Sequence, residues 1–319
     1  MRRVPFLALA LAVLAFGACA DTALPETTIP ATTTDAATPA TTGATDFPVT
    51  IGAGNGPVSI PDRPEAIISL SATATEMLFA IGAGDQVVAV DEFSDFPAEA
   101  PTTELSGFTP NVEAIADYGP DLVVVSFDPE GLVSSLESLG IPVIHHDAAK
   151  TLDDTYTQIE QLGAATGRIA EAAAVVADMQ STIDEMVAAL PTTARGLTYY
   201  HELDDTLVSA TSATFIGQMY SLLGLVNIAD GSDPDGFGYP QLSPEVVVGA
   251  DPDFIFLADT VCCGQSEATV AARPGWEGLG AVTEGRVVEL DDAVASRWGP
   301  RVVEFLETVA GAVAGAPVG

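Results

Sequence analysis

The chain contains one sequence pattern twice, and this internal repeat constrains its fold more than any other feature. The first copy is EAIADYGPD at residues 113–121, which runs into the apolar stretch LVVV; the second is EVVVGADPD at 245–253, which runs into FIFL with the same spacing. Each copy predicts a short helix, a Pro-Asp turn and a buried strand. Two similar lobes are therefore expected, with a groove between them of the kind in which ligands usually bind.

Strands and helices alternate in both halves of the chain. In the first half, strands are predicted at 66–70, 87–90, 122–126 and 143–146, separated by helices at 74–81, 112–117 and 132–139. In the second half, strands are predicted near 197–201, 254–257 and 287–290. Strands separated by helices favour a mainly parallel sheet covered on both faces. The predicted fold class is α/β, with two Rossmann-like lobes.

The middle of the chain is helical. One helix starts at Thr151 and falters at Gly163 and Gly167, and a second, long helix runs over 169–190 until Pro191 stops it. At 1.5 Å per residue the long helix spans roughly 33 Å, about the length of a domain. We therefore predict a first lobe at 47–150, linking helices at 151–190 and a second lobe at 191–319. A single rigid helix that crosses between the lobes predicts that the lobes close only slightly on ligand binding.

The N-terminal segment has the pattern of a lipoprotein signal. Arg2 and Arg3 precede an apolar run at 6–16 that is too short to span a bilayer, and small residues lead directly to Cys19. Residues 1–19 are thus predicted to be a signal peptide with Cys19 as the lipidated residue, since two acyl chains there would hold the protein stably at a membrane. The alternative is an ordinary secretory signal.

Residues 20–46 are dominated by Ala, Thr and Pro and show no apolar periodicity. Such a composition cannot bury enough surface to offset the entropy of ordering, which predicts a disordered tether. No later segment has the pattern of a transmembrane span. The expected location is the extracytoplasmic face of the cell membrane, where the protein is held by its lipid anchor.

The charge of the chain is strongly acidic. Ten Lys and Arg residues face 45 Asp and Glu residues, for a formal net charge of −35. Nucleic-acid binding is excluded, because nothing would neutralise the phosphates. Two readings remain open: adaptation of the surface to salt, or a generally acidic secreted protein.

The two cysteines of the globular part are adjacent, at Cys262 and Cys263. An oxidising compartment favours pairing of leftover cysteines. Neighbouring Cα atoms lie ~3.8 Å apart, however, below the usual range for a disulfide. A strained vicinal disulfide and two free thiols therefore both remain open. No further Cys or His clusters beside them in sequence, so neither a metal site nor a cofactor is expected.

Several motifs in order resemble one protein family over residues 47–315. They are PEAIISLSATATEMLFAIG at 64–82, VDEFSDFP at 90–97, FIGQM at 215–219, YPQLSPE at 239–245 and SRWGPR at 296–301. This pattern is similar to that of the helical-backbone periplasmic binding proteins. These are the substrate-binding components of ABC importers for vitamin B12, haem and ferric siderophores.

The resemblance implies a docking role for two glutamates. In the family, acidic residues at the tips of the lobes contact arginines of the membrane permease, and these match Glu113 and Glu245, which open the two copies of the repeat. Two carboxylates on separate rigid lobes would fix the register and orientation of the protein on the permease and would accept bidentate hydrogen bonds from its arginines. The implied partners are the permease and its ATPase. The protein itself is expected to be a monomer.

The resemblance also implies a ligand between the lobes. Phe93, Phe108 and Tyr239 match groove positions, Arg297 and Trp298 lie in the last matched segment, and a second-lobe strand ends at Tyr200 and His201. Aromatic faces suit a bulky, flat ligand. A corrinoid or an iron chelate is expected, although the chain has only two tryptophans and no evident arginine cluster for an anionic siderophore.

An enzyme is not expected. The chain lacks GxSxG, HExxH and a phosphate loop, and GAGNG at 52–56 precedes a strand rather than following one, so it is interpreted as a turn. Thiol chemistry at Cys262 and Cys263 is the one enzymatic alternative. A further alternative is an extracellular sensor of the same fold that signals to a partner.

Overall fold

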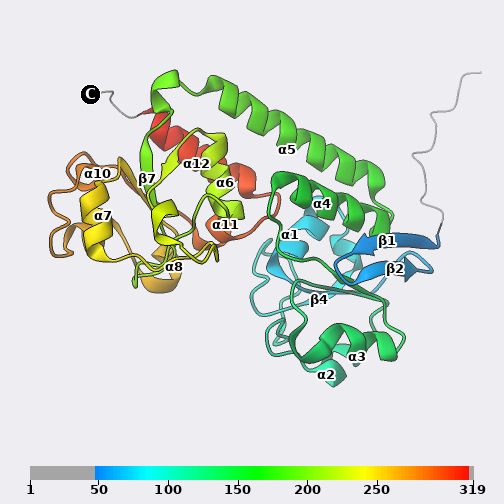
Figure 1. Cartoon of the computed structure of the whole chain (residues 1–319). Coiled ribbons are helices and arrows are strands. Elements are labelled where there is room, and N and C mark those ends of the chain that lie inside the picture. Colours follow the sequence, from blue (N-terminus) through cyan, green and yellow to red (C-terminus); the bar gives the residue numbers. More distant parts are fainter. Residues whose placement is uncertain (1–46, 316–319) are drawn as a thin grey trace, which may run out of the picture. The chain divides into compact units, whose positions relative to one another are not determined.

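The computed structural model describes residues 47–315 (Figure 1). The predicted signal peptide, Cys19 and the tether at 20–46 lie outside the described residues. In the described part of the chain, no helix combines the length and the apolar character that a membrane crossing requires.

The first lobe is built on a four-stranded sheet in the order β4-β3-β5-β6. All neighbouring strands are parallel, and every residue of β3 and β5 is buried, as expected for a sheet covered on both faces. The strands are β3 (Ile67–Leu70), β4 (Val87–Val90), β5 (Leu122–Val125) and β6 (Val143–His145), and the helices between them are α1 (Ala72–Ala80), α2 (Val112–Ala116) and α3 (Leu132–Ser138).

The second lobe repeats this topology. Its parallel sheet has the order β8-β7-β9-β10, so that each strand has a counterpart at the same place in the first sheet. Its strands are β7 (Thr198–Glu202), β8 (Val226–Asn227), β9 (Phe254–Leu257) and β10 (Val287–Glu289). Its helices are α6 (Phe215–Leu222), α7 (Pro244–Ala250), α8 (Thr260–Cys263), α9 (Glu267–Ala271), α10 (Gly280–Thr283), α11 (Asp292–Ser296) and α12 (Val302–Ala314).

The aspartate of each Pro-Asp turn has the same structural role in both lobes. In the first lobe, the Asp121 carboxylate accepts hydrogen bonds from the backbone N–H groups of Glu65 and Ala66, at 2.8 and 3.0 Å. In the second lobe, the Asp253 carboxylate accepts from the backbone N–H and the hydroxyl of Thr198, at 2.8 and 2.9 Å. Each aspartate thus ties the start of one central strand to its neighbour, and the sequence repeat is a structural repeat.

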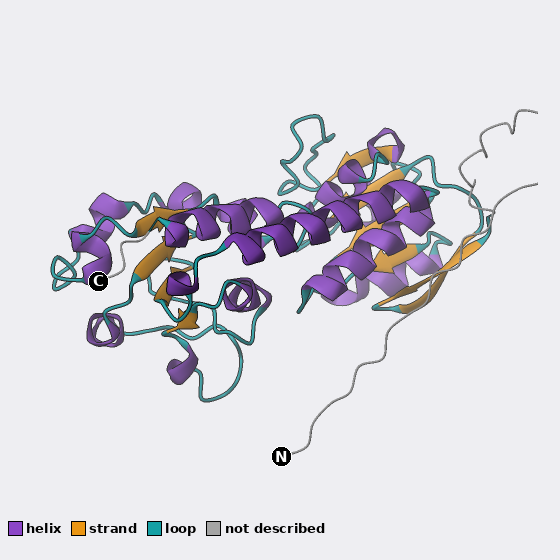
Figure 2. Cartoon of the chain, turned by 90° about the horizontal axis from the view of Figure 1, so that it is seen from above, coloured by secondary structure: helices purple, strands orange, loops and turns teal. Residues whose placement is uncertain are grey.

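Two helices follow the first lobe in the chain. Helix α4 (Leu152–Thr166) packs against α1 of the first lobe, and the long helix α5 (Ile169–Ala189) runs from α4 to α12 of the second lobe (Figure 1, Figure 2). The expected interruption at Gly163 is wrong, because α4 continues through it and ends at Gly167, which adopts a left-handed φ of 73°. A Cβ atom at position 163 would lie 2.4 Å from Cβ of Ala172 in α5. Glycine is therefore present at this position because α4 and α5 approach each other closely.

A hairpin of β1 (Val49–Ala53) and β2 (Gly56–Ile60) precedes the first lobe's sheet. The sequence indicated only a turn at 52–56, whereas the two strands extend well beyond it. The hairpin tip is attached to β6, because the N–H of Gly54 donates to the carbonyl of His145 at 2.8 Å. Short 3₁₀ turns complete the structure at Gly84–Gln86, Pro129–Gly131, Thr192–Ala194 and Asp230–Ser232.

The largest apolar cluster crosses from one lobe to the other through the connecting helices. It joins Ile67 of β3 to Ile159 of α4, Ile183 of α5 and Phe256 of β9, and it ends in α12. Because this core is shared, both lobes pack against the helices that lie between them in the sequence.

Candidate functional site

A pocket of about 150 Å³ lies where the two lobes face each other, and we call it the interlobe pocket. Its first-lobe wall follows the carboxyl ends of parallel strands, which is where open α/β sheets usually bind ligands. Its lining residues are Leu70, Ser71, Ala72, Thr73, Asp91, Phe93, Gly107, Phe108, Ser126 and Phe127 from the first lobe, and Ser296, Arg297 and Trp298 from the second.

Three phenylalanine rings stand together in this wall. The rings of Phe93 and Phe108 meet edge to face with centroids 5.5 Å apart, and those of Phe108 and Phe127 lie 5.0 Å apart. Each side chain keeps about half of its surface exposed, at 51%, 56% and 48%. The rings therefore form a half-uncovered apolar face on the first lobe. Phe127 was not among the predicted ligand contacts, although it lies two residues beyond the end of β5, where a groove residue is expected.

Buried hydroxyl groups support the base of the first-lobe wall. Thr75 donates to Ser69 or Ser94 at 2.9 Å, and Ser94 donates to the carboxylate of Asp91 at 2.6 Å. Burial raises the pKa of Asp91 above its ordinary value, against the lowering effect of the Ser94 hydrogen bond. Ser126 donates to Ser71, the N-cap of α1, at 2.7 Å. This network holds the strand ends in fixed positions beneath the aromatic face.

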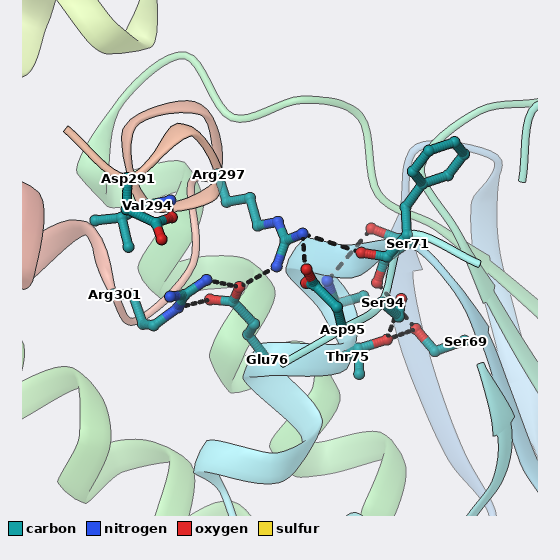
Figure 3. A network of polar contacts seen from close by, with 12 residues as sticks. Ser69, Ser71, Thr75, Glu76, Ser94, Asp95, Asp291, Val294, Arg297 and Arg301 are labelled. Carbon is teal, nitrogen blue, oxygen red and sulfur yellow. Dashed lines mark hydrogen bonds and ion pairs between the residues drawn. The ribbon is translucent and has the colours of Figure 1, made fainter. Parts of the chain in front are cut away.

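Two arginines of the second lobe meet one carboxylate of the first (Figure 3). Arg297 donates to Oε1 of Glu76 at 2.7 Å, and Arg301 donates to Oε1 at 2.8 Å and to Oε2 at 3.1 Å. The side chain of Glu76 is 1% exposed. Arg297 also reaches the carboxylate of Asp95 at 2.8 Å and the carbonyl of Phe93 at 3.0 Å. We call this set of contacts the Glu76 clamp.

Further contacts join the lobes beside the clamp. The indole N–H of Trp298 donates to Oε1 of Gln158 in α4 at 3.0 Å. The guanidinium of Arg301 lies over the ring of Phe96, 4.1 Å from its centroid, in cation–π geometry. The segment between α11 and α12 therefore contacts both the first lobe and α4.

The structure brings four of the predicted ligand contacts together and separates the other three from them. Phe93, Phe108, Arg297 and Trp298 all line the interlobe pocket. Tyr239 is exposed on the second lobe, where its ring lies 6.1 Å from that of Phe237, and it does not line the pocket.

The other two predicted contacts, Tyr200 and His201, lie in the core and have no exposed surface. Strand β7 has neighbours on both sides, and both of its faces are covered. Tyr200 packs edge to face against Trp276. The Nδ1 atom of His201 lies 2.8 Å from the hydroxyl of Tyr220, and burial lowers the pKa of His201 to about 3. In this structure neither side chain reaches a surface where it would contact a ligand.

The two predicted docking glutamates occupy equivalent places. Glu113 lies in the first turn of α2, whose N-cap Asn111 accepts from the N–H of Ala114. Glu245 lies in the first turn of α7, whose N-cap Ser243 accepts from the N–H of Val246. Both glutamates are exposed. Backbone and Ser243 hydrogen bonds lower the pKa of Glu245, so its carboxylate stays charged at neutral pH.

Cys262 and Cys263 are exposed free thiols in α8, so the vicinal disulfide that the sequence left open is not formed in this structure. Within residues 47–315, no group of three or more His, Cys, Asp or Glu side chains is arranged to hold a metal ion.

Three other hollows in the described residues are larger than the interlobe pocket, and one of them, of about 550 Å³, lies beside Phe79 and Arg168. A second, of about 740 Å³, lies beside His146, and the third, of about 610 Å³, lies beside Tyr156. None of the three has an aromatic face comparable to that formed by the three phenylalanines.

Comparisons with known proteins give a consistent result. The periplasmic binding protein family matches residues 67–294, which is more than half of the chain. A cobalamin-binding protein of Halobacterium salinarum is 33% identical over 264 residues, covering 80% of this chain and 70% of the relative. An uncharacterized ABC transporter substrate-binding lipoprotein of Bacillus subtilis is 29% identical over 261 residues, covering 79% of this chain and 81% of that protein.

The fold has solved counterparts. The crystal structure of the periplasmic vitamin B12 binding protein BtuF of Vibrio cholerae is similar, with a TM-score of 0.65 and 26% sequence identity. The match covers 79% of this chain and 98% of that one. These relatives are binding proteins rather than enzymes.

Proposed function

Because the chain belongs to the periplasmic binding protein family, we propose that it captures a corrinoid at the interlobe pocket and delivers it to an ABC permease. The aromatic face of Phe93, Phe108 and Phe127 carries the proposal. In the described structure, about half of the surface of each side chain is exposed. Together the three rings form an apolar platform. The names of the cobalamin-binding relative and of the B12-binding structure support the same ligand class.

The size of the pocket indicates where such a ligand would lie. Ligand sites commonly enclose about 300–1,000 Å³, whereas this pocket encloses about 150 Å³. A corrinoid would therefore rest on the outer face of the phenylalanines instead of filling the pocket beneath them. Phe237 and Tyr239 are exposed on the second lobe and would supply aromatic contacts from that side.

The charges near the pocket favour a ligand with little net charge. Arg297 is the one guanidinium among the lining residues, and it is already bound to Glu76, Asp95 and the carbonyl of Phe93. A strongly anionic chelate would find few free cations in a chain whose net charge is −35. A corrinoid, with its broad ring and amide side chains, fits these conditions better.

The test is a binding screen with cyanocobalamin, haemin and a ferric siderophore. Cyanocobalamin should co-elute with the protein in gel filtration, as read from its visible absorbance, and should quench the fluorescence of Trp298. Substitution of Phe93 and Phe108 by alanine should weaken binding at least about tenfold, since each lost aromatic contact is worth on the order of 1 kcal/mol. Leu139→Ala is the matched control, because Leu139 is an exposed apolar residue of the same lobe outside the lining.

Equal affinity of the double alanine variant and the wild type would contradict the assignment of the aromatic face. Tight binding of haemin or of the siderophore, with no binding of cyanocobalamin, would contradict the ligand class.

A further inference from the structure

The exposed pair of adjacent thiols in α8 is a reactive feature that ligand capture does not use. Cys262 and Cys263 lie on a single helical turn that ends at Gly264, which has a left-handed φ of 67°. Both side chains are exposed. A hydrogen bond with the Cys263 thiol, followed by burial and by the carboxylate of Asp292, raises the pKa of the Cys262 thiol to about 12. Because the two thiols are adjacent in the chain and both exposed, a small oxidant can reach either of them.

The same helical turn is attached to α11 through one carboxylate. Asp292, the first residue of α11, accepts the backbone N–H groups of Thr260 at 2.8 Å, Val261 at 3.0 Å and Cys262 at 2.7 Å. It also accepts the hydroxyl of Thr260 at 3.1 Å. The Asp292 carboxylate therefore satisfies the N–H groups that the start of a helix leaves without partners.

The other end of α11 reaches the interlobe pocket. Helix α11 ends at Ser296, and Arg297 is its C-cap. Ser296, Arg297 and Trp298 form the second-lobe wall of the pocket. One short helix thus connects the cysteine turn to the residues that face the ligand site.

We propose that Cys262 and Cys263 form a thiol–disulfide redox pair whose oxidation by a small-molecule disulfide alters the second-lobe wall of the interlobe pocket. Cys263 attacks one sulfur of the oxidant and forms a mixed disulfide, and the first thiol product leaves. Cys262 then attacks the Cys263 sulfur, and the second thiol product leaves. Two protein thiols lose two electrons and two protons, which end on two molecules of reduced small thiol.

The order of attack follows from the surroundings of the two thiols. The neighbouring Cys263 thiol, burial and the Asp292 carboxylate, which accepts the backbone N–H of Cys262 at 2.7 Å, raise the pKa of the Cys262 thiol. Since the thiolate is the nucleophile in disulfide exchange, Cys263 reacts first and Cys262 closes the bond.

Closing the bond requires a change in the backbone. Adjacent Cα atoms are about 3.8 Å apart, whereas disulfides usually join Cα atoms about 4.4–6.8 Å apart. The helical turn at Thr260–Cys263 must therefore open, which removes the N–H of Cys262 from Asp292. Opening the turn also withdraws the N–H of Val261, so that Asp292 keeps only its hydrogen bonds from Thr260. Helix α11 is then held less firmly at its N-terminal end, and Arg297 and Trp298 shift at its other end.

The first measurement is independent of any ligand. The full chain is treated with oxidised glutathione, and the fragment that contains both cysteines is analysed by mass spectrometry. We expect a fragment lighter by two hydrogen atoms, and we expect faster hydrogen exchange of the amides of Val261 and Cys262. The variants Cys262→Ser and Cys263→Ser should each stop at a single mixed disulfide. Two glutathione groups on the wild-type fragment, or unchanged exchange in the oxidised protein, would overturn the proposal.

The second measurement rests on the proposed corrinoid capture. The affinity for cyanocobalamin is compared between the reduced and the oxidised protein, and we expect a difference of about tenfold, abolished in Cys262→Ser. An equal affinity in both forms would refute the link to the pocket. If neither form binds cyanocobalamin, the proposed function fails, while fragment mass and amide exchange still decide whether the redox pair exists.

Discussion

The guanidinium of Arg297 donates a 2.7 Å hydrogen bond to Oε1 of Glu76, although the two residues are 221 positions apart in the sequence. Arg301 binds the same carboxylate, so that two cations of the second lobe meet at one buried anion of the first. The shared core and the Glu76 clamp act on the same interface, one through apolar packing and the other through ion pairing. Their combination supports the expectation that the lobes move little against each other.

The clamp predicts a large loss of stability when Glu76 is neutralised. Glu76→Gln keeps the size of the side chain but leaves Arg297 and Arg301 without their buried counter-charge. Removal of one partner from a buried ion pair typically costs about 3–5 kcal/mol. Urea unfolding followed by circular dichroism should show a fall in the free energy of unfolding of this size.

Asp95→Asn serves as the control for this experiment. Asp95 pairs with the same Arg297, but its side chain is 70% exposed, and exposed ion pairs contribute only about 0–1 kcal/mol. Similar small losses in both variants would show that the clamp does not hold the lobes together.

Substitution by alanine is expected to have opposite effects on stability at two helical glycines, because only one of them lies at the close approach of α4 and α5. At Gly163, an added Cβ would lie 2.4 Å from Cβ of Ala172 and 3.0 Å from the carbonyl oxygen of Arg168. Gly163→Ala should therefore destabilise the protein by roughly 1–3 kcal/mol through overpacking. At Gly311 in α12, no atom lies within 4 Å of the added Cβ, so that Gly311→Ala should stabilise by about 0.5–1 kcal/mol. Thermal unfolding of both variants checks the sign, and a gain in stability for Gly163→Ala would contradict the close approach.

Features set by neighbouring residues could be predicted from the sequence, whereas features set by contacts between distant residues could not. Strands β4 and β9 were predicted with their observed bounds, because short apolar runs between turn residues are a local signal. The repeat predicted that the two lobes would share a topology. The role of Gly163 was missed, because a glycine within a helix looks like a break until the packing partner at Ala172 is known.

The predicted ligand contacts that line the interlobe pocket lie in loops, whereas those placed in a strand do not reach it. Phe93 and Phe108 lie in the loop between β4 and α2 and line the pocket, whereas Tyr200 and His201 belong to a strand that is covered on both faces. No local pattern marks which face of a central strand is free. The pairing of Glu76 with Arg297 arises only from the packing of the lobes, so that no sequence spacing would indicate it.

The buried carboxyl of Asp259 predicts a pH-dependent stability. Burial, together with the nearby charge of Glu202, raises the pKa of Asp259 from 3.8 to about 7. Between about pH 4 and pH 7, the Asp259 carboxyl is therefore protonated in the folded state and ionised in the unfolded state. By linkage, this group stabilises the folded state fully below pH 4, and its contribution is lost as the pH rises to 7.

The measurement is the difference in the free energy of unfolding between the wild type and Asp259→Asn as a function of pH. The free energy of unfolding of the wild type, relative to that of the variant, should fall by up to about 1.4 kcal/mol per pH unit across this window. Burial lowers the pKa of His146 to about 4, but this residue is present in both proteins and cancels in the difference. A difference that is constant with pH would contradict the raised pKa.

Membrane attachment through Cys19 is a prediction from the sequence alone. Expressed in a bacterial host with its lipoprotein pathway, the full chain should fractionate with membranes and incorporate an alkyne-labelled fatty acid. Cys19→Ser should abolish labelling and release the protein from the membrane, since the anchor depends on the acyl chains. The double variant Cys262→Ser and Cys263→Ser is the control and should be labelled as the wild type is. Labelling of Cys19→Ser would indicate another acceptor.

Delivery to a permease predicts that Glu113 and Glu245 act together without contacting the ligand. Each lies in the first turn of a short helix at an equivalent place in its lobe, and neither lines the interlobe pocket. Substitution of both by alanine should leave the affinity for cyanocobalamin unchanged and abolish uptake into vesicles that contain the partner permease and its ATPase. A charged rim pair mainly guides docking, so that each single variant should show a partial loss of uptake relative to the wild type, and this loss should become smaller as ionic strength rises. The control is the double alanine variant at Glu160 and Glu185, exposed glutamates of the connecting helices. Undiminished uptake by the Glu113 and Glu245 double variant would refute the docking role.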